Sequence, residues 1–591
     1  MKTGVTLSVL KLLFISILGI VFLTGCRFEG FFGKGNSTAA PVNASTPIIS
    51  VQPVSAVYVQ GDAAIPLEIM ANVNDGGVLS YQWYSNGINS NENGSIISEA
   101  TSQSYVPLTS DIGTTYYYAV VTNTNDNAKK EKRAFVVSDA AGIEVNALSA
   151  SFYDADLNLL AKYGNLSFGH EVELNSNKTA YNITDWYLAN NDTAVDFYTI
   201  ANKSVNFYAS SNVTEITSQN DLAYINTDNV TLAGKYILLN DIKLDENGAG
   251  FDDDGWKPIG NPSNSFTGIF NGNSHKITNL WINRPSAESI GFFGYAENAT
   301  MKNIGVEITE GKSITGNDSV GGIVGQVVNT NITYVYSIGN VGGDSHVGGI
   351  AGSINNGSIT NTYSTGNIEG IYFDIGGIVG VAMNGSVITN VYSTRNVSGY
   401  GYVGGIAGST RHIDAGSTRY SNIVNTYSIG DVNGNSFVGS IVGYADHGNI
   451  TNTYSRGNIN SANVYIGGIM GWISNSDISN NAVINGLIAG KNDASRVVGF
   501  IGSDINLNIV SNNFVLDSIV GTFANIDDTR YHGIDKTIEQ LKTKETYSDA
   551  VNGDGLGGLG WKFGDNIDNP WVWGAFDDYP YPTLYWQTQK P

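Results

Sequence analysis

Short apolar runs rich in Val and Ile, separated by Gly, Asn and Ser, dominate residues 214 to about 525. A glycine-rich box recurs there eight times, from IGFFG at Ile290, through VGGIVG at Val320, to VGFIG at Val498. Between the boxes lies a second motif, I-x-N-x-Y-S-x-G-x-V, as in ITNTYSTGNI. Each unit predicts a few short strands, and one unit cannot bury its apolar face unless other units stack on it. The pattern therefore predicts a long β-solenoid over residues 214–525, with aliphatic ladders inside and Gly at tight corners.

Two residue types recur in register within these repeats. Asn occupies one position of nearly every unit, with Tyr334 in its place once; the members are Asn279, Asn303, Asn361, Asn390, Asn425, Asn452, Asn480 and Asn512. This column predicts a stacked amide ladder at a coil corner, which we favour over direct contact with a glycan. A second column is aromatic and consists of Tyr336, Tyr363, Tyr392, Tyr427 and Tyr454. It predicts core or half-buried packing, with an exposed stacking strip for sugars as the alternative.

The glycine-rich boxes resemble the GLUG motif of secreted and surface bacterial proteins. The segment that leads into them is similar to that family as well, in KYILLNDIKL and in GIFNGNSHKITNLWI. The resemblance covers over half of the chain and implies a repetitive domain on a bacterial surface protein.

A first β unit is expected before the solenoid, at residues 47–143. Its short alternating strands with turn signals are typical of an immunoglobulin-like β-sandwich. Trp83 resembles the core Trp of such a sandwich, Tyr116 resembles its tyrosine corner, and Tyr118 stands where a disulfide Cys would lie. The segment resembles bacterial surface Ig-like domains, which lack that disulfide, and its aromatic residues are expected in the core.

A second, smaller unit is expected at residues 146–211. Its NITDWYL, VDFYT and SVNFYA segments resemble the internalin-type B repeat, also called the Listeria–Bacteroides repeat, a compact β-grasp-like spacer. The resemblance implies a core of Trp186, Phe197 and Phe207. His170 and Glu171 lack the second His of a zinc-protease motif, so we interpret them as exposed strand residues.

Residues 1–25 have the pattern of a lipoprotein signal peptide. Their apolar run is too short for a comfortable bilayer span. The run ends in Leu-Thr-Gly-Cys26, which resembles the bacterial lipobox and contains the only Cys of the chain. The resemblance implies that Cys26 is lipidated and anchors the chain to a membrane, and Arg27 after it implies the outer membrane if the cell has one. Residues 26–46 are expected to form a flexible tether.

Residues 526–591 break the repeat pattern and are expected to cap the solenoid. The segment DKTIEQLKTKETY, with Thr537 at its start, predicts a helix. Four Trp residues follow it: Trp561, Trp571, Trp573 and Trp586. Bulky aromatic residues and Pro suit a cap that blocks pairing at a sheet edge. We favour this role over a sugar-binding platform.

Charge and composition narrow the function. The chain carries 30 Lys and Arg against 53 Asp and Glu, a net charge of −23, which argues against a nucleic-acid partner. A single Cys excludes an intrachain disulfide and a multi-Cys metal site. The scattered His and unaligned acids predict no catalytic residue and no cofactor. The acidic residues Asp245, Asp252, Asp253 and Asp254 are a calcium candidate, although their spacing is not that of an EF-hand and a solvated loop is preferred.

These features together predict an all-β, lipid-anchored, surface-exposed protein of the cell envelope. Its expected function is adhesion or another surface interaction, in which the chain binds an extracellular glycan or protein without catalysis. A polysaccharide-processing β-helix enzyme, or the non-catalytic part of one, is one alternative, and a structural surface stalk is another. A long groove with paired acids would favour the enzyme, whereas a uniformly capped rod would favour the binder.

Overall fold

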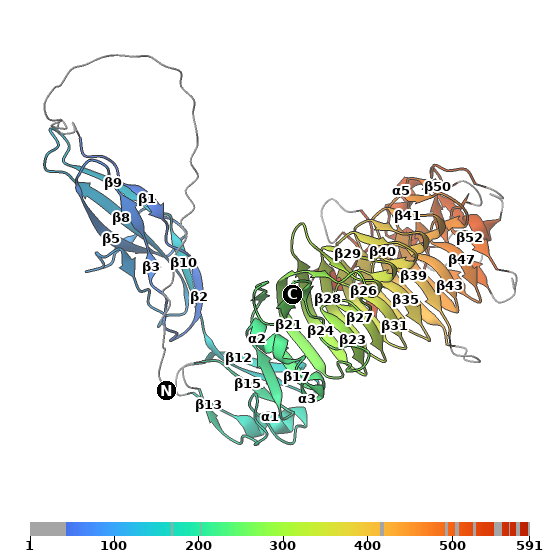
Figure 1. The fold of residues 1–591 in the computed structure, drawn as a ribbon, viewed down its shortest axis with the longest axis horizontal. Coiled ribbons are helices and arrows are strands. Elements are labelled where there is room, and N and C mark those ends of the chain that lie inside the picture. Colours follow the sequence, from blue (N-terminus) through green and yellow to red (C-terminus); the bar gives the residue numbers. More distant parts are fainter. Residues whose placement is uncertain are drawn as a thin grey trace, which may run out of the picture. The chain divides into compact units, whose positions relative to one another are not determined.

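A computed structural model describes residues 43–166, 170–200, 203–413, 419–490, 494–502, 508–523, 528–548, 558–566, 568–574 and 580–588. Strands dominate these residues (Figure 1), so the all-β fold class is confirmed. The chain divides after Asn146 into two compact units. The predicted signal peptide, Cys26 and most of the tether lie outside the described residues.

The first unit contains a six-stranded sheet and two smaller sheets of two strands each. The large sheet has the order β2-β10-β8-β5-β6, with β9 paired to β8. Its strands are β2 (Ala56–Val59), β5 (Val78–Asn86), β6 (Ser95–Ile96), β8 (Gly113–Thr124), β9 (Arg133–Val137) and β10 (Ala141–Asn146). The small sheets pair β1 (Ile48–Val51) with β4 (Met70–Asn72) and β3 (Leu67–Glu68) with β7 (Ser104–Tyr105).

The aromatic core of this unit differs from the prediction in the tyrosine that β8 contributes. Trp83 is fully buried, and its indole N–H donates to the Ser102 carbonyl over 2.9 Å. Tyr117, not Tyr116, joins Trp83 in the hydrophobic cluster, because alternate residues of β8 face opposite sides of the sheet. Tyr118 is buried too, but on the opposite face of β8 from Trp83, where it stacks on Tyr84 with ring centroids 5.2 Å apart.

The second unit begins with the small β domain. Strand β11 (Leu148–Tyr153) pairs with β12 (Leu159–Leu166) antiparallel and with β15 (Val205–Tyr208) parallel. Strand β13 (Glu171–Val172) pairs with β14 (Tyr198–Thr199), and the helix α1 (Leu174–Tyr181), which the sequence analysis did not predict, follows β13. His170 and Glu171 are exposed beside this short pair, as expected.

Aromatic packing in the small domain corrects one predicted core residue. Trp186 and Phe207 are fully buried, but the Phe197 side chain is 59% exposed. Phe152 takes the third core position and stacks on Phe207 with ring centroids 5.0 Å apart. Phe197 lies in a short irregular segment where no strand fixes which side chains point inward, so sequence alternation carries no information there.

The small domain is attached to the solenoid through the turn at residues 154–158. Lys302 is buried, and its ammonium donates to the Asp156 carbonyl and to the Asn158 side chain. Asn271, also buried, donates to the Leu157 carbonyl over 2.7 Å. These bonds satisfy polar groups that would otherwise be buried without partners. The small domain is therefore held against the first coils of the solenoid.

The solenoid coils stack on one another along the domain and form four sheets of 15, 10, 8 and 7 strands (Figure 1). The regular coils pair in parallel, whereas the first strands of the 10-stranded sheet pair antiparallel. The 15-stranded sheet includes β21 (Ile269–Leu280), β24 (Thr300–Ile308), β28 (Asn331–Ile338), β32 (Ser358–Ser364), β36 (Val387–Ser393), β40 (Ser421–Ser428), β44 (Gly448–Ser455), β49 (Ala482–Val483) and β54 (Phe514–Leu516). The 10-stranded sheet includes β25 (Ser313–Thr315), β29 (Asn340–Gly343), β33 (Ile368–Gly370), β37 (Val397–Ser398), β41 (Val432–Gly434), β45 (Ile459–Ser461) and β50 (Ile488–Ala489).

The glycine-rich boxes build the other two sheets. The 7-stranded sheet consists of β26 (Asp318–Gly321), β30 (Ser345–Gly348), β34 (Phe373–Gly376), β38 (Gly401–Gly404), β42 (Ser436–Gly439), β46 (Ile466–Gly467) and β51 (Ala494–Ser495). The 8-stranded sheet consists of β23 (Phe293–Glu297), β27 (Val324–Val328), β31 (Ala351–Asn355), β35 (Val379–Met383), β39 (Ala407–Arg411), β43 (Val442–Asp446), β47 (Met470–Ser474) and β52 (Val498–Ile501).

The box sequence explains this geometry. Its Ile and Val side chains are fully buried and stack in register, as Val347, Ile375 and Val403 do. The Gly residues lie where neighbouring coils approach closely. A Cβ on Gly376 would lie 2.7 Å from the Ala407 Cα of the next coil, so a larger residue would push the coils apart.

The Asn column forms the predicted amide ladder. Its residues adopt left-handed backbone, and the side-chain amide of one coil donates to the amide oxygen of the preceding coil, for example from Asn390 to Asn361 over 3.1 Å and from Asn425 to Asn390 over 3.2 Å. Asn279 does not join this ladder: it donates to the Leu244 carbonyl over 2.7 Å, and Asn271 accepts from Asn303 in its place.

Both ends of the solenoid are covered. The first end carries β16 (Val213–Ile216), β17 (Lys235–Leu238) and the short helices α2 (Gln219–Tyr224) and α3 (Asn229–Leu232), which have Ser218 and Asp228 as N-caps. At the other end, β55 (Ile534–Lys536) pairs with β54 as a final rung. Two short helices, α5 (Ile538–Leu541) and α6 (Glu545–Ser548), replace the single predicted helix, and α5 is capped by Thr537.

The rest of the C-terminal region does not stay at that end. Strands β56 (Phe563–Asn566), β57 (Asn569–Val572) and β58 (Thr583–Leu584) form a small antiparallel sheet, followed by a 3-10 turn at Tyr585–Thr588. We call the described residues between 558 and 588 the tail. Successive tail residues contact progressively earlier coils: Trp561 donates to the Asn480 carbonyl over 2.8 Å, and Trp586 donates to the Asn390 carbonyl over 3.0 Å. The tail therefore runs back along the flank of the solenoid, a path that the sequence did not predict.

Candidate functional site: an aromatic cleft on the flank of the solenoid

The predicted tyrosine column exists and stacks along the 15-stranded sheet. Neighbouring rings lie 4.9 to 5.0 Å apart between centroids, and their planes differ by no more than 12°. Tyr427 and Tyr454 are buried, whereas Tyr336, Tyr363 and Tyr392 are half-buried. The column is thus buried at its Tyr454 end and partly exposed at its Tyr336 end.

The tail causes this difference in burial. Trp571 lies beside Tyr454 and stacks on Trp561 with centroids 4.5 Å apart. The Tyr454 hydroxyl donates to the Pro582 carbonyl over 2.9 Å, and Gln587 donates to the Tyr427 hydroxyl over 2.7 Å. These contacts answer the question that the sequence left open about the Trp residues: Trp561 and Trp571 are buried packing residues.

A cleft of about 320 Å³ lies where the tail ends. Its lining combines rings with small polar groups and consists of Ser274, His275, Asn303, Ile304, Gly305, Tyr334, Val335, Tyr336, Asn361, Tyr363, Tyr392, Trp586 and Gln587. Trp586 closes one side and lies 5.9 Å from Tyr363, with the ring planes 22° apart. A concave site lined by rings with a few fixed polar groups is the usual form of a small-molecule site.

Tyr334 is the unusual residue of this cleft. It occupies the Asn position of its coil with a φ of 53°, a left-handed conformation that is strained for a bulky residue. Its side chain is 44% exposed, and its hydroxyl lies 3.2 Å from that of Tyr585 in the tail. The ladder residues on either side, Asn303 and Asn361, also line the cleft. The one break in the Asn column therefore coincides with the cleft, a signal that the sequence already contained.

Acids lie near the cleft but not in its lining: Asp241 is 3.2 Å from His275, and Glu307 and Asp241 add to the effect of burial on the pKa of Tyr336. Burial raises the pKa of Tyr336 and of Tyr363 to about 12, so both hydroxyls stay protonated and can donate hydrogen bonds. No carboxylate belongs to the lining residues. The cleft can stack on a ligand and hydrogen-bond to it, but it contains no pair of acids for general acid–base chemistry.

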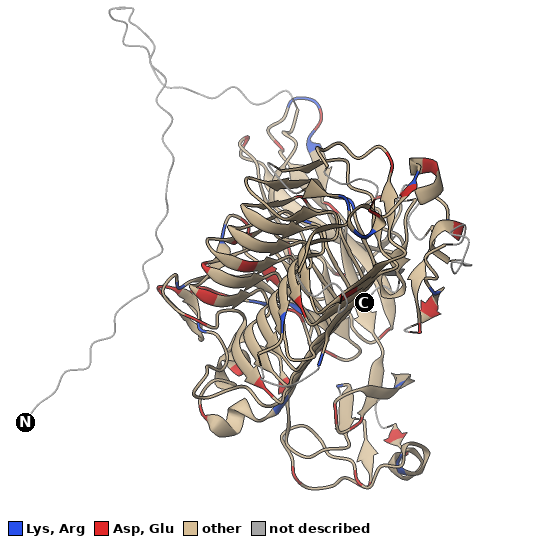
Figure 2. Cartoon of the chain, turned by 90° about the vertical axis from the view of Figure 1, so that its right-hand side faces the viewer, with Lys and Arg blue, Asp and Glu red and all other residues tan. Residues whose placement is uncertain are grey.

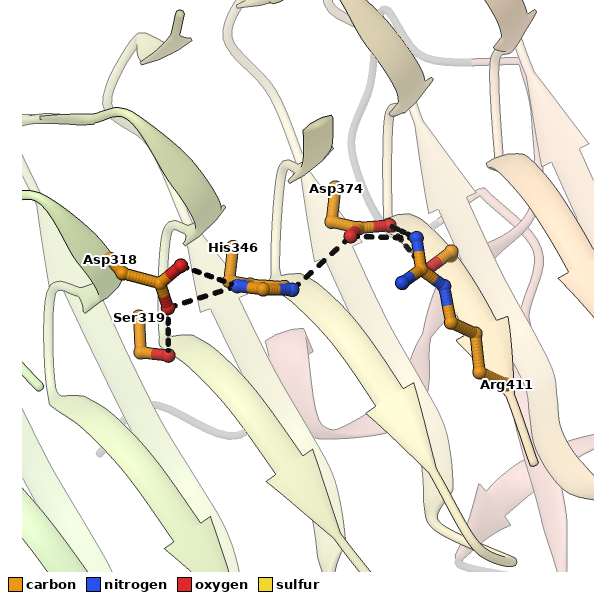
Figure 3. Close-up of polar contacts among 6 residues, drawn as sticks. Asp318, Ser319, His346, Asp374 and Arg411 are labelled. Carbon is orange, nitrogen blue, oxygen red and sulfur yellow. Dashed lines mark hydrogen bonds and ion pairs between the residues drawn. The ribbon is translucent and has the colours of Figure 1, made fainter. Parts of the chain in front are cut away.

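A row of paired charges crosses four coils on the edge of the 7-stranded sheet (Figure 3). His346 Nδ1 lies 2.9 Å from both carboxylate oxygens of Asp318, and His346 Nε2 lies 3.3 Å from Asp374. Arg411 donates to both oxygens of Asp374 over 2.6 and 2.7 Å. Ser319 donates to Asp318 over 2.7 Å and not to His346, so it is not arranged as a nucleophile activated by that imidazole. The sequence analysis missed this row because its members differ in residue type from coil to coil.

The row has a fixed charge pattern at neutral pH. Burial alone would lower the pKa of His346, but hydrogen bonds to Asp318 and Asp374 outweigh it and raise this pKa to about 9. Burial alone would raise the pKa of Asp318, yet its bonds with His346 and Ser319 bring a net lowering. Acids and bases thus alternate along the row. Asp374 lies between His346 and Arg411 and pairs with both.

This pattern predicts a pH dependence of stability. Because the folded pKa of His346 is about 9 against an ordinary value of 6.5, its contribution is full below pH 6.5 and disappears as pH rises to 9. We expect the melting temperature to fall over that window. In the variant His346→Asn, which suits the left-handed backbone at this position, the same part of the curve should be flatter. Thermal melts from pH 6 to pH 9.5 measure this, and equal slopes for the two proteins would contradict it.

Two acids of the calcium candidate, Asp252 and Asp254, face cationic side chains of the chain itself. Arg284 pairs with Asp252 over 2.6 Å and lies 3.7 Å from Asp254, and Lys257 lies 3.7 Å from Asp252. Asp245 accepts from the Asn247 backbone over 3.0 Å. Within the described residues, no group of three or more His, Cys, Asp or Glu side chains is placed to hold one metal ion. Nor does any described helix combine the length and apolarity needed to cross a bilayer.

Comparisons with known proteins give short or distant matches. No protein-family model matches the chain. Halomucin of Haloquadratum walsbyi is 36% identical over 129 residues, which are 20% of this chain and 1% of that protein. A protein of Evansella cellulosilytica described as a Gly-rich membrane protein is 45% identical over 51 residues, which are 8% of this chain and 6% of that protein. The chain thus spans only a small fraction of the length of these curated relatives.

Two solved structures are distant matches to the chain. A protein of Bacteroides ovatus named as an immunoglobulin A1 protease has a TM-score of 0.34 and 20% identity, over 64% of this chain and 93% of that one. A second structure named IgA1 protease has a TM-score of 0.27 and 14% identity, over 74% of this chain and 28% of that one. No family is assigned to the chain from these matches.

Proposed function

We propose that the chain is a lipid-anchored adhesin of the bacterial cell surface that binds a neutral glycan in the aromatic cleft without catalysing a reaction. The observation that carries the proposal is Tyr334, an exposed ring held in strained backbone beside the half-buried rings of Tyr336, Tyr363 and Trp586. A strained conformation persists where the surrounding structure fixes it, and such residues gather at functional sites.

The chemistry of the cleft suits a sugar. Pyranose rings present C–H faces that pack on aromatic rings and hydroxyl groups that exchange hydrogen bonds with amides and hydroxyls. Asn303 and the protonated Tyr336 hydroxyl supply such partners. Net charge favours a neutral ligand, because the chain carries −23 and would repel an anionic polymer.

The absence of catalysis is part of the proposal and rests on two observations. The cleft lining lacks a carboxylate. In the charged row, Asp318 and Asp374 are both paired with bases, and the pKa of Asp318 is lowered, whereas a general acid needs a raised pKa.

The surface location is also a proposal. It rests on the lipobox-like segment that ends at Cys26 and on the resemblance of the repeats to the GLUG motif. The names of the two partial relatives, a halomucin and a membrane protein, agree with it. Arg27 after the lipidated position favours the outer membrane if the cell has one. The Ig-like and internalin-type resemblances would make the preceding domains spacers between membrane and solenoid.

The variant Tyr334→Asn tests the binding site. Asn suits the left-handed backbone and restores the usual ladder residue, so the fold should keep its melting temperature while the cleft loses a ring. We expect affinity to fall about tenfold, which corresponds to the loss of about 1.4 kcal/mol of ring contact. Titration calorimetry with laminarin-, cello- and manno-hexaose measures it, and Tyr224→Ala, an exposed ring on α2, is the control. Wild-type protein that binds none of these sugars, or a variant that binds as well as wild type, would contradict the proposal. Release of reducing ends would contradict the absence of catalysis.

The variant Cys26→Ser tests the anchor. Without the thiol no thioether to lipid can form, so the protein should move from the detergent-soluble membrane fraction to the aqueous fraction. Metabolic labelling with palmitate followed by fractionation measures this. Labelling equal to that of the wild-type chain would refute lipidation at Cys26.

A further inference from the structure

A second group of aromatic side chains lies on the 7- and 8-stranded sheets, away from the tyrosine column. We call it the aromatic face; it consists of Tyr402, Phe437, Tyr444, Tyr465, Trp472 and Phe500. Tyr402, Phe437 and Tyr465 stand at equivalent places in three successive coils, and Tyr444, Trp472 and Phe500 pair in register one sheet further on. All six side chains are half-buried.

The rings of the aromatic face support one another. Neighbouring centroids lie 4.9 to 6.2 Å apart, with tilted or edge-on planes, for example 4.9 Å between Tyr402 and Phe437 and 4.9 Å between Trp472 and Phe500. Such packing fixes the side chains before a ligand arrives and reduces the entropy lost on binding. The face is therefore a preorganised surface.

Three of these rings occupy backbone positions that disfavour them. Tyr402, Phe437 and Tyr465 have φ values of 53°, 58° and 62°. At the equivalent places in earlier coils the chain has Ser319, His346 and Asp374, and at its other left-handed corners it mostly uses Asn. The core beneath is already filled by fully buried residues such as Val403 and Val438. The solenoid does not need aromatic residues at this corner in order to fold, so their presence points to a ligand.

The aromatic face ends at a polar pocket of about 440 Å³. Its lining includes Tyr402 and Tyr444 from the face together with the charged row of Asp318, His346, Asp374 and Arg411 (Figure 3). The two acids and two bases of the row neutralise one another through ion pairs of 2.6 to 3.3 Å. A third acid of the lining, Asp446, lies 2.9 Å from His447, so it too has a partner within the chain. The pocket thus offers hydrogen-bonding groups next to a surface of rings.

We propose that the aromatic face and this pocket form a second binding site, for a neutral polysaccharide chain that lies across successive coils. Each column places one ring in each of three successive coils. Since stacked coils are about 4.8 Å apart, the face presents a linear array to a linear polymer. The pocket at its end would take a terminal stretch of that polymer through its hydroxyls. The proposal shares the ligand class of the proposed function but concerns different residues, and it gives one rod two glycan sites on different sheets.

Charge and shape favour this occupant over a protein. A second copy of the chain would bring another −23 charges, which opposes self-association. Interfaces with folded proteins have a central cluster with a surrounding rim, whereas the rings here form a strip two columns wide. Charged residues are sparse along the stacked coils (Figure 2), and the acids of the pocket beside the face are already paired with His346, Arg411 and His447.

The double variant F437N/Y465N tests the second site in the full chain. Asn suits both left-handed positions, so the melting temperature should stay within a few degrees of wild type. Affinity electrophoresis through gels with laminarin, mannan or hydroxyethyl cellulose measures polymer binding. We expect the double variant to lose about tenfold or more of the polymer affinity, while hexaose binding in the cleft is unchanged. Tyr334→Asn should show the opposite pattern, and Tyr224→Ala should change neither.

The outcomes separate the two sites. A double variant that folds normally and is retarded like wild type overturns the second site and leaves the cleft standing. If the double variant loses polymer binding and Tyr334→Asn does not, the second site is supported. This holds even if the hexaose titrations show no binding in the cleft. If the double variant instead loses binding to immobilised fibronectin or collagen and not to any polysaccharide, the face is a protein-docking surface and the proposal is wrong. A double variant that melts far below wild type shows that the rings serve the fold and also overturns it.

Discussion

Replacing Trp571 by Ala is expected to lower the free energy of unfolding by about 3–5 kcal/mol, the usual effect of deleting a fully buried Trp. Trp571 is fully buried, stacks on Trp561, packs beside Tyr454 and donates to the Asn425 side chain over 3.3 Å. Its loss removes the central contact between the tail and the tyrosine column. Thermal unfolding followed by near-ultraviolet circular dichroism measures the effect, because that signal reports on aromatic rings in fixed packing.

Two controls sharpen this result. Trp571→Phe keeps a ring but loses the indole N–H, so we expect a much smaller loss of stability. Hydrogen exchange in Trp571→Ala should rise in β40 and β44, which the tail covers, and stay unchanged in β11 and β15 of the small domain. Wild-type stability in Trp571→Ala would show that the tail is not bound as described.

Replacing Asp374 by Ala is expected to cost about 3 kcal/mol, since it breaks a buried ion pair and leaves the partner charges uncompensated. The Asp374 side chain is 2% exposed and accepts from Ser409, His346 and Arg411. Asp374→Asn retains a hydrogen-bond acceptor and suits the φ of 64° at this position. Its free energy of unfolding should therefore fall less than that of Asp374→Ala. Urea titrations of both variants at pH 7 measure the difference. Equal stability of the Ala and Asn variants would mean that the carboxylate does not bind the three donors in solution.

The repetitive part of the fold could be predicted because its physics is local and repeated. Val347, Ile375 and Val403 follow the same box in each coil, and Gly376 is required by a close approach that recurs. Because the box occurs eight times, a deviation in one unit does not hide the pattern. The Asn ladder was predictable for the same reason, and only Asn279, which lies before the regular coils begin, was misplaced.

The residues of the candidate sites were harder to predict because they are the exceptions to the repeat. Asp318, His346, Asp374 and Arg411 differ in type, so no periodicity aligns them, and only the register of β26, β30 and β34 brings the first three together. Tyr334 was visible as a break in the Asn column, but its exposure depends on where the tail ends. The path of the tail follows from contacts between residues more than 100 positions apart, as between Tyr454 and Pro582, which no local pattern encodes.

The tail also determines the order in which the domain is completed. A solenoid held only by contacts between neighbouring coils can add coils one at a time as the chain emerges from the ribosome or the export channel. The tail is synthesised after every coil that it touches, and its partners extend from Asn480 back to Tyr334. It can dock only on coils that are already stacked, and it then links them into one cooperative block. The cleft, which has Trp586 as one wall, is therefore the last part of the solenoid to form.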